Sequence, residues 1–306
     1  MSTFEKLVDR IETLLHGYSL NTESTTWLVS AATTSDTTLT VYDSTQVGRG
    51  FIEIEDEILY VSSTNNSTNQ LTIAPWGRAQ RGTSVATHAV NKKVTVSPTF
   101  PRGEIKKAIN YTLDAMYPMV FGIGKTELTY VAAKTTYDVP DDVEQILNLT
   151  HSVIGPSNEW LPIRAWQLDR SANPTTFGTG GELGKSLSVY SPVTPGRKIN
   201  VVYGKRPTLF DLTLASTVDQ EYATVTGMPS YSEDVVLYGA AFRMISFLDP
   251  SRLGPLSAQA DLLDQQRGSR SGENASRFLF NIYQTRLGEV AENQRRQYPV
   301  RSHYQR

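Results

Sequence analysis

The side chains best suited to chemistry are few and scattered along this chain of 306 residues. Its four histidines are His16, His88, His151 and His303, and none has a second histidine at a metal-ligand spacing. The chain has no cysteine, which excludes disulfides, thiolate metal sites and a cysteine nucleophile. No GxSxG elbow is present, so a Ser–His–Asp site would have to assemble from distant residues. A hydrolase is therefore an open alternative that requires a cleft holding His88 or His151 against a carboxylate.

A run of carboxylates between Glu53 and Glu57 could bind a divalent cation, because such cations prefer oxygen ligands. In the segment FIEIEDEILYVSS, isoleucines alternate with Glu53, Glu55 and Glu57, which predicts one half-buried strand. Carboxylates on one face of a strand are more often simply solvated. We therefore expect no metal and no cofactor.

Two stretches resemble the end of a phosphate-binding loop, Gly124–Thr126 and Gly184–Ser186. The motif needs a glycine five residues before the last one, where this chain has Met119 and Thr179. Strand-like sequence follows both stretches, whereas the motif requires a helix whose N-terminus faces the phosphate. Nucleotide binding is disfavoured.

Three tryptophans fall in β-rich sequence: Trp76, Trp160 and Trp166. They could form a platform on which sugars stack. They could equally anchor cores or interfaces, which is the commoner use of tryptophan in β-domains.

The charge balance excludes some classes of protein. The chain has 29 Lys and Arg against 31 Asp and Glu, a net charge of −2, which disfavours a dedicated nucleic-acid binder. From Arg277 onward, however, the sequence contains six arginines and only two glutamates, a local net charge of +4. This end is either a solvated helix face with an unstructured terminus or an interaction arm, since Arg, Tyr and Pro are frequent at interface hot spots.

The elements that must position these residues alternate along the chain. Residues 1–21 have the apolar period of one helix, with Ser2 and Glu5 as a capping box and Gly17 as the stop. Residues 22–98 alternate apolar and polar side chains, which is typical of β-strands. Residues 99–122 are predicted to form a second helix, and residues 123–229 a second β region. Residues 230–296 are predicted to form three helices, the middle one near 256–268, and 297–306 an extended arm.

Helices that are separated in sequence and have one apolar face each could share a single core. We therefore expect an α+β fold: a helical bundle with two inserted antiparallel β-modules, each a small barrel or sandwich. No apolar run reaches the roughly 20 residues that span a bilayer, and the charged N-terminal helix is unlike a signal peptide.

The run PWGRAQRGTSVATHAVNKKVTVSPTFPRGEIKKAINYTLDAMYP resembles neck proteins of tailed bacteriophages, where a β-module leads through "FPR" into a helix. The ending, with "VVLYGAAFRMI" and "RRQYPVRSHY", is similar to that of head-to-tail connector (adaptor) proteins. The resemblance covers Phe51–Pro118 and Asp234–Tyr304.

This resemblance implies a structural virion protein, not an enzyme, made in the host cytoplasm and built into the neck. It implies a homo-oligomeric ring, generally twelve-fold, beneath the portal, joined to a tail or stopper protein. DNA would pass through the lumen during packaging and ejection without being read. The resemblance implies that a portal-binding arm is formed by Arg286, Arg295, Arg296, Tyr298, Pro299, Arg301, His303, Tyr304 and Arg306.

A second hypothesis is a tail or baseplate binding module whose β-domains read carbohydrates or receptors. It requires exposed tryptophan platforms, whereas the adaptor hypothesis requires the C-terminal arm.

Overall fold

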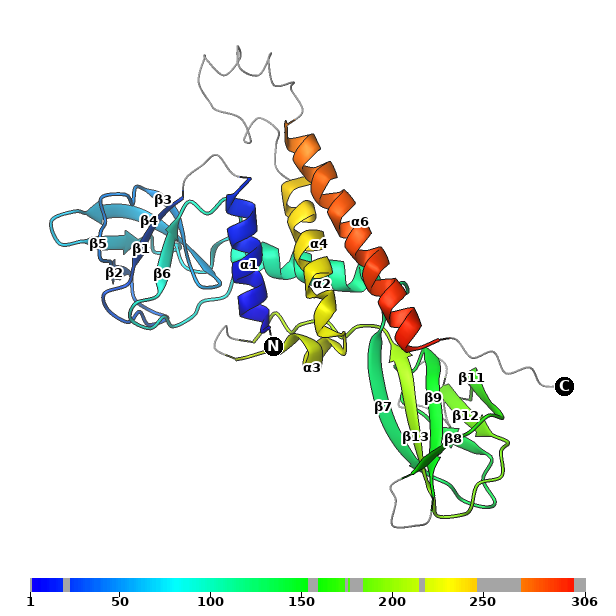
Figure 1. Cartoon of the computed structure of the whole chain (residues 1–306). Helices are drawn as coiled ribbons and strands as arrows, with labels where there is room; N and C mark the ends of the chain where they lie inside the picture. Colours follow the sequence, from blue (N-terminus) through cyan, green and yellow to red (C-terminus); the bar gives the residue numbers. More distant parts are fainter. Residues whose placement is uncertain are drawn as a thin grey trace.

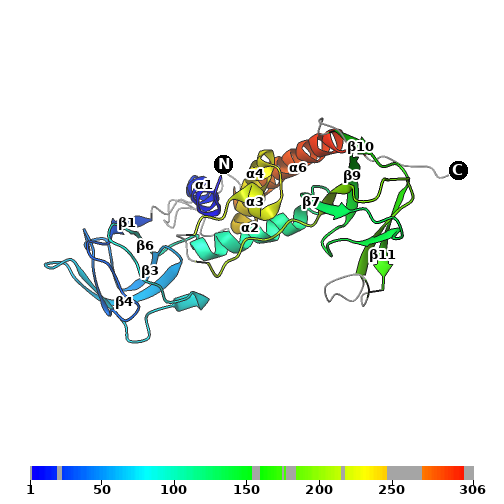
Figure 2. The same cartoon turned by 90° about the horizontal axis from the view of Figure 1, so that it is seen from below.

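The structure is a computed structural model that describes residues 2–18, 23–153, 159–173, 176, 184–214, 218–246 and 271–299. A helical body lies in the middle and one β-module lies at each end of it (Figures 1 and 2). Each of the three parts has its own cluster of buried apolar side chains. The part of the chain predicted as a helix near 256–268 lies outside the described residues.

The helical body is made from segments far apart in the sequence. Its helices are α1 (Phe4–His16), α2 (Arg102–Met116), α3 (Tyr222–Thr226), α4 (Glu233–Ser246) and α6 (Ser271–Gln297). The α2 stripe predicted from its helical period is buried, including Ile105, Ile109 and Met116. On α6 the same reasoning holds for Leu279 and Tyr283 but fails for Phe278, which is 57% exposed.

The predicted helical bundle is wrong. Helix and strand each account for 31% of the residues as described, and the five described helices do not form a bundle. Helix α2 runs across α1, α4 and α6 instead of alongside them (Figure 1). Apolar periodicity marks the buried face of a helix but does not fix the angle at which two helices cross.

Gly239 of α4 permits one of these close crossings. A Cβ atom at this position would lie 2.3 Å from Cγ2 of Thr112 in α2 and 2.9 Å from Cε2 of Tyr283 in α6. Glycine therefore lets three helices meet at one point.

The first β-module is a six-stranded antiparallel sheet with the order β1-β6-β3-β4-β5-β2. A bridge between Leu28 and Val41 joins its two edges and partly closes it into a barrel. Its strands are β1 (Ser24–Trp27), β2 (Thr38–Thr40), β3 (Gly50–Ile54), β4 (Glu57–Asn65), β5 (Gln70–Ile73) and β6 (Lys93–Val96).

The second β-module contains two antiparallel sheets that enclose one apolar core. The four-stranded sheet has the order β10-β9-β13-β7, with β7 (Gly122–Thr129), β9 (Gln145–Ser152), β10 (Trp160–Pro162) and β13 (Lys198–Lys205). The three-stranded sheet has the order β11-β12-β8, with β8 (Thr136–Asp138), β11 (Trp166–Ala172) and β12 (Gly184–Val189).

Each module begins and ends on paired strands. Ser24 of β1 lies opposite Val96 of β6, and Gly122 of β7 lies opposite Lys205 of β13. The chain therefore leaves the helical body and returns to it at nearly the same place in both modules.

The predicted capping box at the start of α1 is also wrong. Thr3 is the N-cap residue and makes no side-chain capping bond. Glu5, expected to cap the helix, binds side chains of α2 instead.

Candidate functional site

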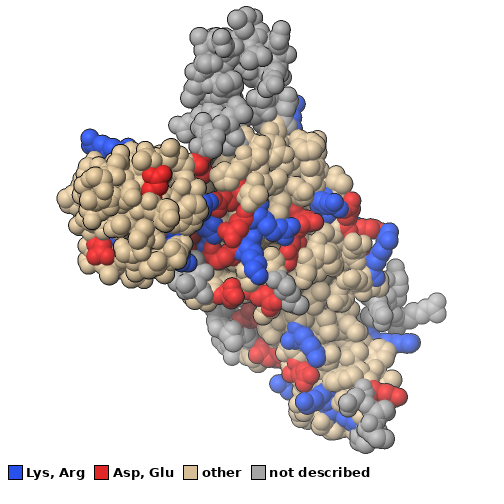
Figure 3. All heavy atoms as spheres, turned by 60° about the vertical axis from the view of Figure 1, so that its left-hand side comes forward, with Lys and Arg blue, Asp and Glu red and all other residues tan. Residues whose placement is uncertain are grey.

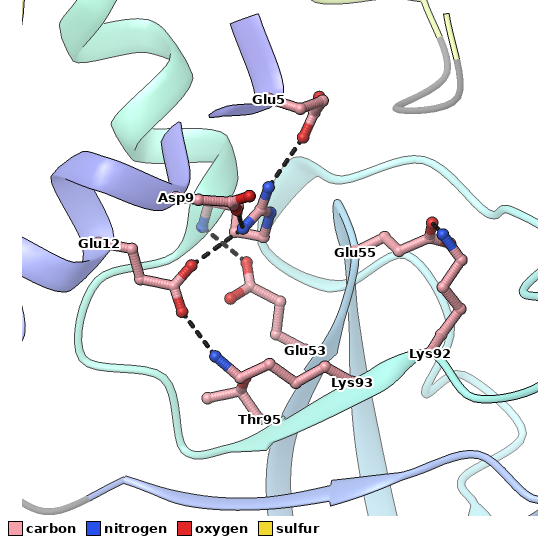
Figure 4. Close-up of a pocket in the computed structure, with 9 residues that line it drawn as sticks. Glu5, Asp9, Glu12, Glu53, Glu55, Lys92, Lys93 and Thr95 are labelled. Atoms are coloured by element: carbon pink, nitrogen blue, oxygen red, sulfur yellow. Dashed lines mark hydrogen bonds and ion pairs between the residues drawn. The ribbon is translucent and has the colours of Figure 1, made fainter. Parts of the chain in front are cut away.

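Charged side chains gather where α1 and α2 meet the first β-module, whereas the outer face of that module shows few charges (Figure 3). We call this cluster the ionic junction. It comprises Glu5, Asp9 and Glu12 of α1, Glu53 and Asp56 of the β3–β4 hairpin, Lys93 of β6, and Arg102 and Lys106 of α2. A cavity of about 290 Å³ lies among several of these residues (Figure 4).

Arg102 is the centre of the ionic junction. Its guanidinium binds Glu5 at 2.8 Å, Asp9 at 2.7 Å and Glu12 at 2.9 Å. Although burial disfavours the charged form, the hydrogen bonds to Asp9 and Glu5 outweigh it and raise the pKa of Arg102. One cation therefore holds three successive turns of α1 against α2.

Lys106, one turn further along α2, connects the helices to the first module. Its Nζ lies 2.5 Å from Glu5 and 2.7 Å from Asp56, which belongs to the hairpin turn between β3 and β4. Lys93 makes a second connection, 2.8 Å from Glu12. These bonds join three elements far apart in the chain, so the junction sets the position of the module on the helices.

Glu53 is the unusual member of the junction because it is only 5% exposed and its carboxylate has no cationic side chain in hydrogen-bond contact among the described residues. Its Oε1 accepts the backbone N–H of Arg102 at 2.8 Å, at the start of α2. Burial outweighs that hydrogen bond and raises the pKa of Glu53 to about 8. Glu53 is therefore protonated at neutral pH.

The run from Glu53 to Glu57 is not the single half-buried strand that the alternation predicts. Ile54 pairs directly with Glu57, so Glu55 and Asp56 form the turn of a hairpin. Glu55 has a φ of 54°, the left-handed conformation that two-residue hairpin turns require. The expectation of a solvated acidic face is also wrong, since Glu53 and Glu57 are buried.

A second charged cluster lies inside the first β-module. The ring nitrogens of His88 lie 2.9 Å from Glu55 and 2.9 Å from Glu57, and Arg78 binds both oxygens of Glu57 at 2.7 and 2.8 Å. The backbone N–H groups of Ala79 and Ala86 also donate to Glu57. Every carboxylate oxygen of Glu57 thus has donors, as a buried charge requires.

These contacts determine the protonation of the cluster. Burial disfavours the charged imidazole, but hydrogen bonds to the two glutamates outweigh it and raise the pKa of His88. The hydrogen bond from His88 lowers the pKa of Glu55 to about 2. The pKa of Glu57 is also lowered to about 2, because bonds from His88 and Arg78 outweigh its desolvation.

The cluster has the His–carboxylate contact that a hydrolase needs but lacks the other parts of such a site. The His88 side chain is fully buried, and each of its ring nitrogens is hydrogen-bonded to a carboxylate. It therefore cannot take a proton from a nucleophile. His151 has Nδ1 near the Ser152 carbonyl, and His16 lies 3.7 Å from Glu12 at the surface; His303 lies outside the described residues.

The remaining sequence candidates do not come together. Gly124–Thr126 lies within β7 and Gly184–Ser186 within β12, while Thr179 lies outside the described residues. Trp76 follows β5 in the first module, whereas Trp160 and Trp166 belong to the second, so the three cannot form one platform. In the described ranges, no group of three or more His, Asp or Glu side chains could hold a metal ion.

The structure describes only the first part of the predicted portal-binding arm. Arg286, Arg295 and Arg296 are exposed on α6, and Tyr298 and Pro299 follow its end beside the second module. Arg286 pairs with Glu289 and Arg296 with Glu292 on the same helix. The other predicted arm residues lie outside the described residues: Arg301, His303, Tyr304 and Arg306.

Sequence reasoning missed the ionic junction, although a signal was present. Glu5, Asp9 and Glu12 follow the helical period beside the apolar stripe of α1, and Arg102 and Lys106 repeat it on α2. Matching acidic and basic faces on two helices could have been taken as evidence of contact.

No protein-family model matches the chain, and no curated protein sequence is significantly similar to it. In the described part of the chain, no helix is both long enough and apolar enough to cross a bilayer.

Proposed function

We propose that this chain is a structural, non-enzymatic subunit of a bacteriophage neck, a head-to-tail adaptor that forms a ring and binds the portal. The sequence resemblance described above suggests the role. The observation that carries it is the arrangement of α6, whose last buried residue, Gln294, is followed by exposed Arg295 and Arg296 and then by Tyr298 and Pro299. A cationic, aromatic end fixed to a rigid body suits a protein that docks on a larger assembly.

The use of charge in the molecule also supports an assembly role. The charged side chains of Arg102, Lys106 and His88 bind carboxylates and hold helices and strands together. Such ion pairs stabilise the geometry of the elements that they join.

The test is binding to purified portal rings, measured by co-sedimentation and electron microscopy. The full chain is expected to bind as a ring, and deletion of residues 300–306 together with Arg295→Ala and Arg296→Ala is expected to abolish binding. Arg206→Ala, which removes an exposed arginine near Asp114 on the helical body, is the control and should bind normally. A full-length chain that stays monomeric and ignores portal rings at high concentration contradicts the proposal.

A carbohydrate-reading tail module is the second candidate, and one observation favours it. Trp76 is 62% exposed and stacks on Tyr60 with ring centroids 4.9 Å apart, a surface to which a sugar ring could bind. This candidate predicts that Trp76→Ala removes glycan binding, whereas deletion of residues 300–306 leaves incorporation into the particle intact. The adaptor proposal predicts the reverse for the deletion.

A further inference from the structure

The two sheets of the second β-module leave an opening between strands β9 and β11. Strand β10 pairs only with Thr150–Ser152 of β9, so the first half of β9 has no neighbour on that side among the described strands. Strand β11 is the edge of its own sheet and pairs only with β12 there. Two strand edges therefore border the same opening.

A cavity lies at this opening between β9 and β11. A cavity of about 730 Å³ is lined by Gln145, Ile146 and Leu147 of β9 and by Trp166, Gln167 and Leu168 of β11, among others. A smaller cavity of about 90 Å³ shares Ile146, Leu147 and Trp166 and continues along β9 to Leu149. We call the two together the β9–β11 slot.

The lining residues show that the slot runs along the edges of the two strands and does not lie on the surface of either sheet. Side chains alternate between the two faces of a strand, so three consecutive residues can line one cavity only where the backbone itself borders it. This is the case on both sides, at Gln145–Leu147 and at Trp166–Leu168. Along an edge strand, alternate residues point their N–H and C=O groups away from the neighbouring strand, where an added strand can bind them.

The charged side chains that line the slot are all cationic. Arg170 and Arg295 line the larger cavity and Arg164 the smaller one, and no carboxylate lines either. All three arginines are exposed, and none has a carboxylate partner in the described ranges of the chain. The Arg170 guanidinium donates to the main-chain carbonyl of Glu144, which fixes its position at one end of the slot.

We propose that the β9–β11 slot binds an extended segment of a partner protein in which acidic and apolar residues alternate. The segment adds a β-strand to the edge of β9, β11 or both. Its apolar side chains contact Ile146 and Leu168, and its carboxylates pair with Arg164, Arg170 and Arg295. About four residues of added strand, some 13 Å, would span Gln145–Asn148. This inference does not depend on the adaptor role.

The test uses the full chain and a capped eight-residue peptide that alternates valine with glutamate. The matched control peptide has lysine in place of glutamate. Fluorescence anisotropy measures binding, and hydrogen exchange measures protection of those backbone amides in Gln145–Asn148 and Trp166–Leu168 that face the outer edge of their strand.

The acidic peptide is expected to bind and to slow exchange at these amides, and the basic peptide to do neither. Reversing three charges, with Arg164→Glu, Arg170→Glu and Arg295→Glu, should weaken binding at least about tenfold. Reversing Lys6, Arg49 and Lys107, exposed cations outside the second module, should leave binding unchanged. If the first variant does not fold, a fall in affinity with added salt provides the same evidence of charge pairing.

Three results would overturn the proposal. One is no slowing of exchange at these amides when the acidic peptide is added up to millimolar concentration. Another is equal binding of the acidic and basic peptides. The third is protection that appears without peptide as the protein concentration rises, together with dimerisation, since the slot would then be an interface between copies of this chain.

Discussion

The side-chain amide of Gln294 binds both backbone groups of Phe121: its Nε2 donates to the carbonyl at 2.6 Å, and its Oε1 accepts the N–H at 3.0 Å. Gln294 belongs to the last turns of α6, and Phe121 immediately precedes β7. Both residues are buried. This pair therefore fixes the end of the last helix to the start of the second β-module, 173 residues away in the sequence.

Replacing Gln294 by alanine should destabilise the protein by about 2–3 kcal/mol, because it leaves a buried N–H and C=O of Phe121 without partners. The neighbouring Asn293→Ala is the control, since Asn293 is exposed and should change stability by less than about 0.5 kcal/mol. Urea unfolding followed by circular dichroism measures both. Equal effects of the two substitutions would show that the Gln294 bonds contribute nothing.

Replacing either of two helical glycines by alanine should change the stability of the protein, but in opposite directions. Gly239→Ala places a methyl group 2.3 Å from Thr112, so it should destabilise the helical body by about 1–3 kcal/mol. Gly288→Ala on α6 meets no atom within 4 Å and should stabilise the helix by about 0.5–1 kcal/mol. Melting temperatures of the two variants test this pair, and a stabilising Gly239→Ala would contradict the close crossing.

Glu53 should make the protein less stable as the pH rises from about 4.5 to about 8. In this range the folded state keeps a proton on Glu53 that the unfolded state releases, so raising the pH favours unfolding. Glu53→Gln retains an oxygen that accepts the Arg102 N–H and has no charge to bury. It should match the wild type near pH 4 and exceed it above pH 8, with an upper bound of roughly 5 kcal/mol.

Thermal unfolding between pH 4 and pH 9 measures this difference. Glu104→Gln, an exposed glutamate at the start of α2, is the control and should not change the slope with pH. A Glu53→Gln variant that gains stability at pH 4 but not at pH 9 would contradict the assigned protonation state.

His88 should contribute most to stability in its charged form. Its pKa is raised in the folded state, so its contribution is complete below the unfolded value near 6.5 and is lost as the pH rises through the folded value. His88→Gln should cost about 2–4 kcal/mol at pH 5.5 and less at pH 9, because it leaves buried carboxylates without a cation. His151→Gln serves as the control, and a deficit of His88→Gln that grows with pH would refute this assignment.

Local patterns predicted the elements better than their arrangement. Ile105 and Ile109 were assigned to the buried face of α2 because helical periodicity is a property of adjacent turns. Phe278 follows the same period yet is exposed, because periodicity does not reveal whether another element covers a helix face. The bundle prediction failed for a similar reason. Gly239 allows α2 and α4 to cross closely, and the sequence pattern does not predict the angle at which they cross.

Helical spacing indicates the charged faces of α1 and α2, but it does not show which side chains of the ionic junction or of the His88 cluster form pairs. Arg102 binds Glu5 from 97 residues away, and His88 binds Glu57 from 31 residues away. The hairpin that brings Glu57 toward His88 has Glu55 and Asp56 in its turn, without the Asn-Gly or Asp-Gly pair that usually marks one. The alternation of Ile and Glu therefore suggested one continuous strand.

The pairing of Ser24 with Val96 and of Gly122 with Lys205 makes each β-module separable from the rest of the chain. The two ends of each β-module lie about 5 Å apart, as opposed residues of antiparallel strands do. Removal of a whole module would leave ends that a short loop can join, with the helical core unchanged. Each module can therefore be removed or exchanged as one unit without interrupting α1, α2, α4 or α6.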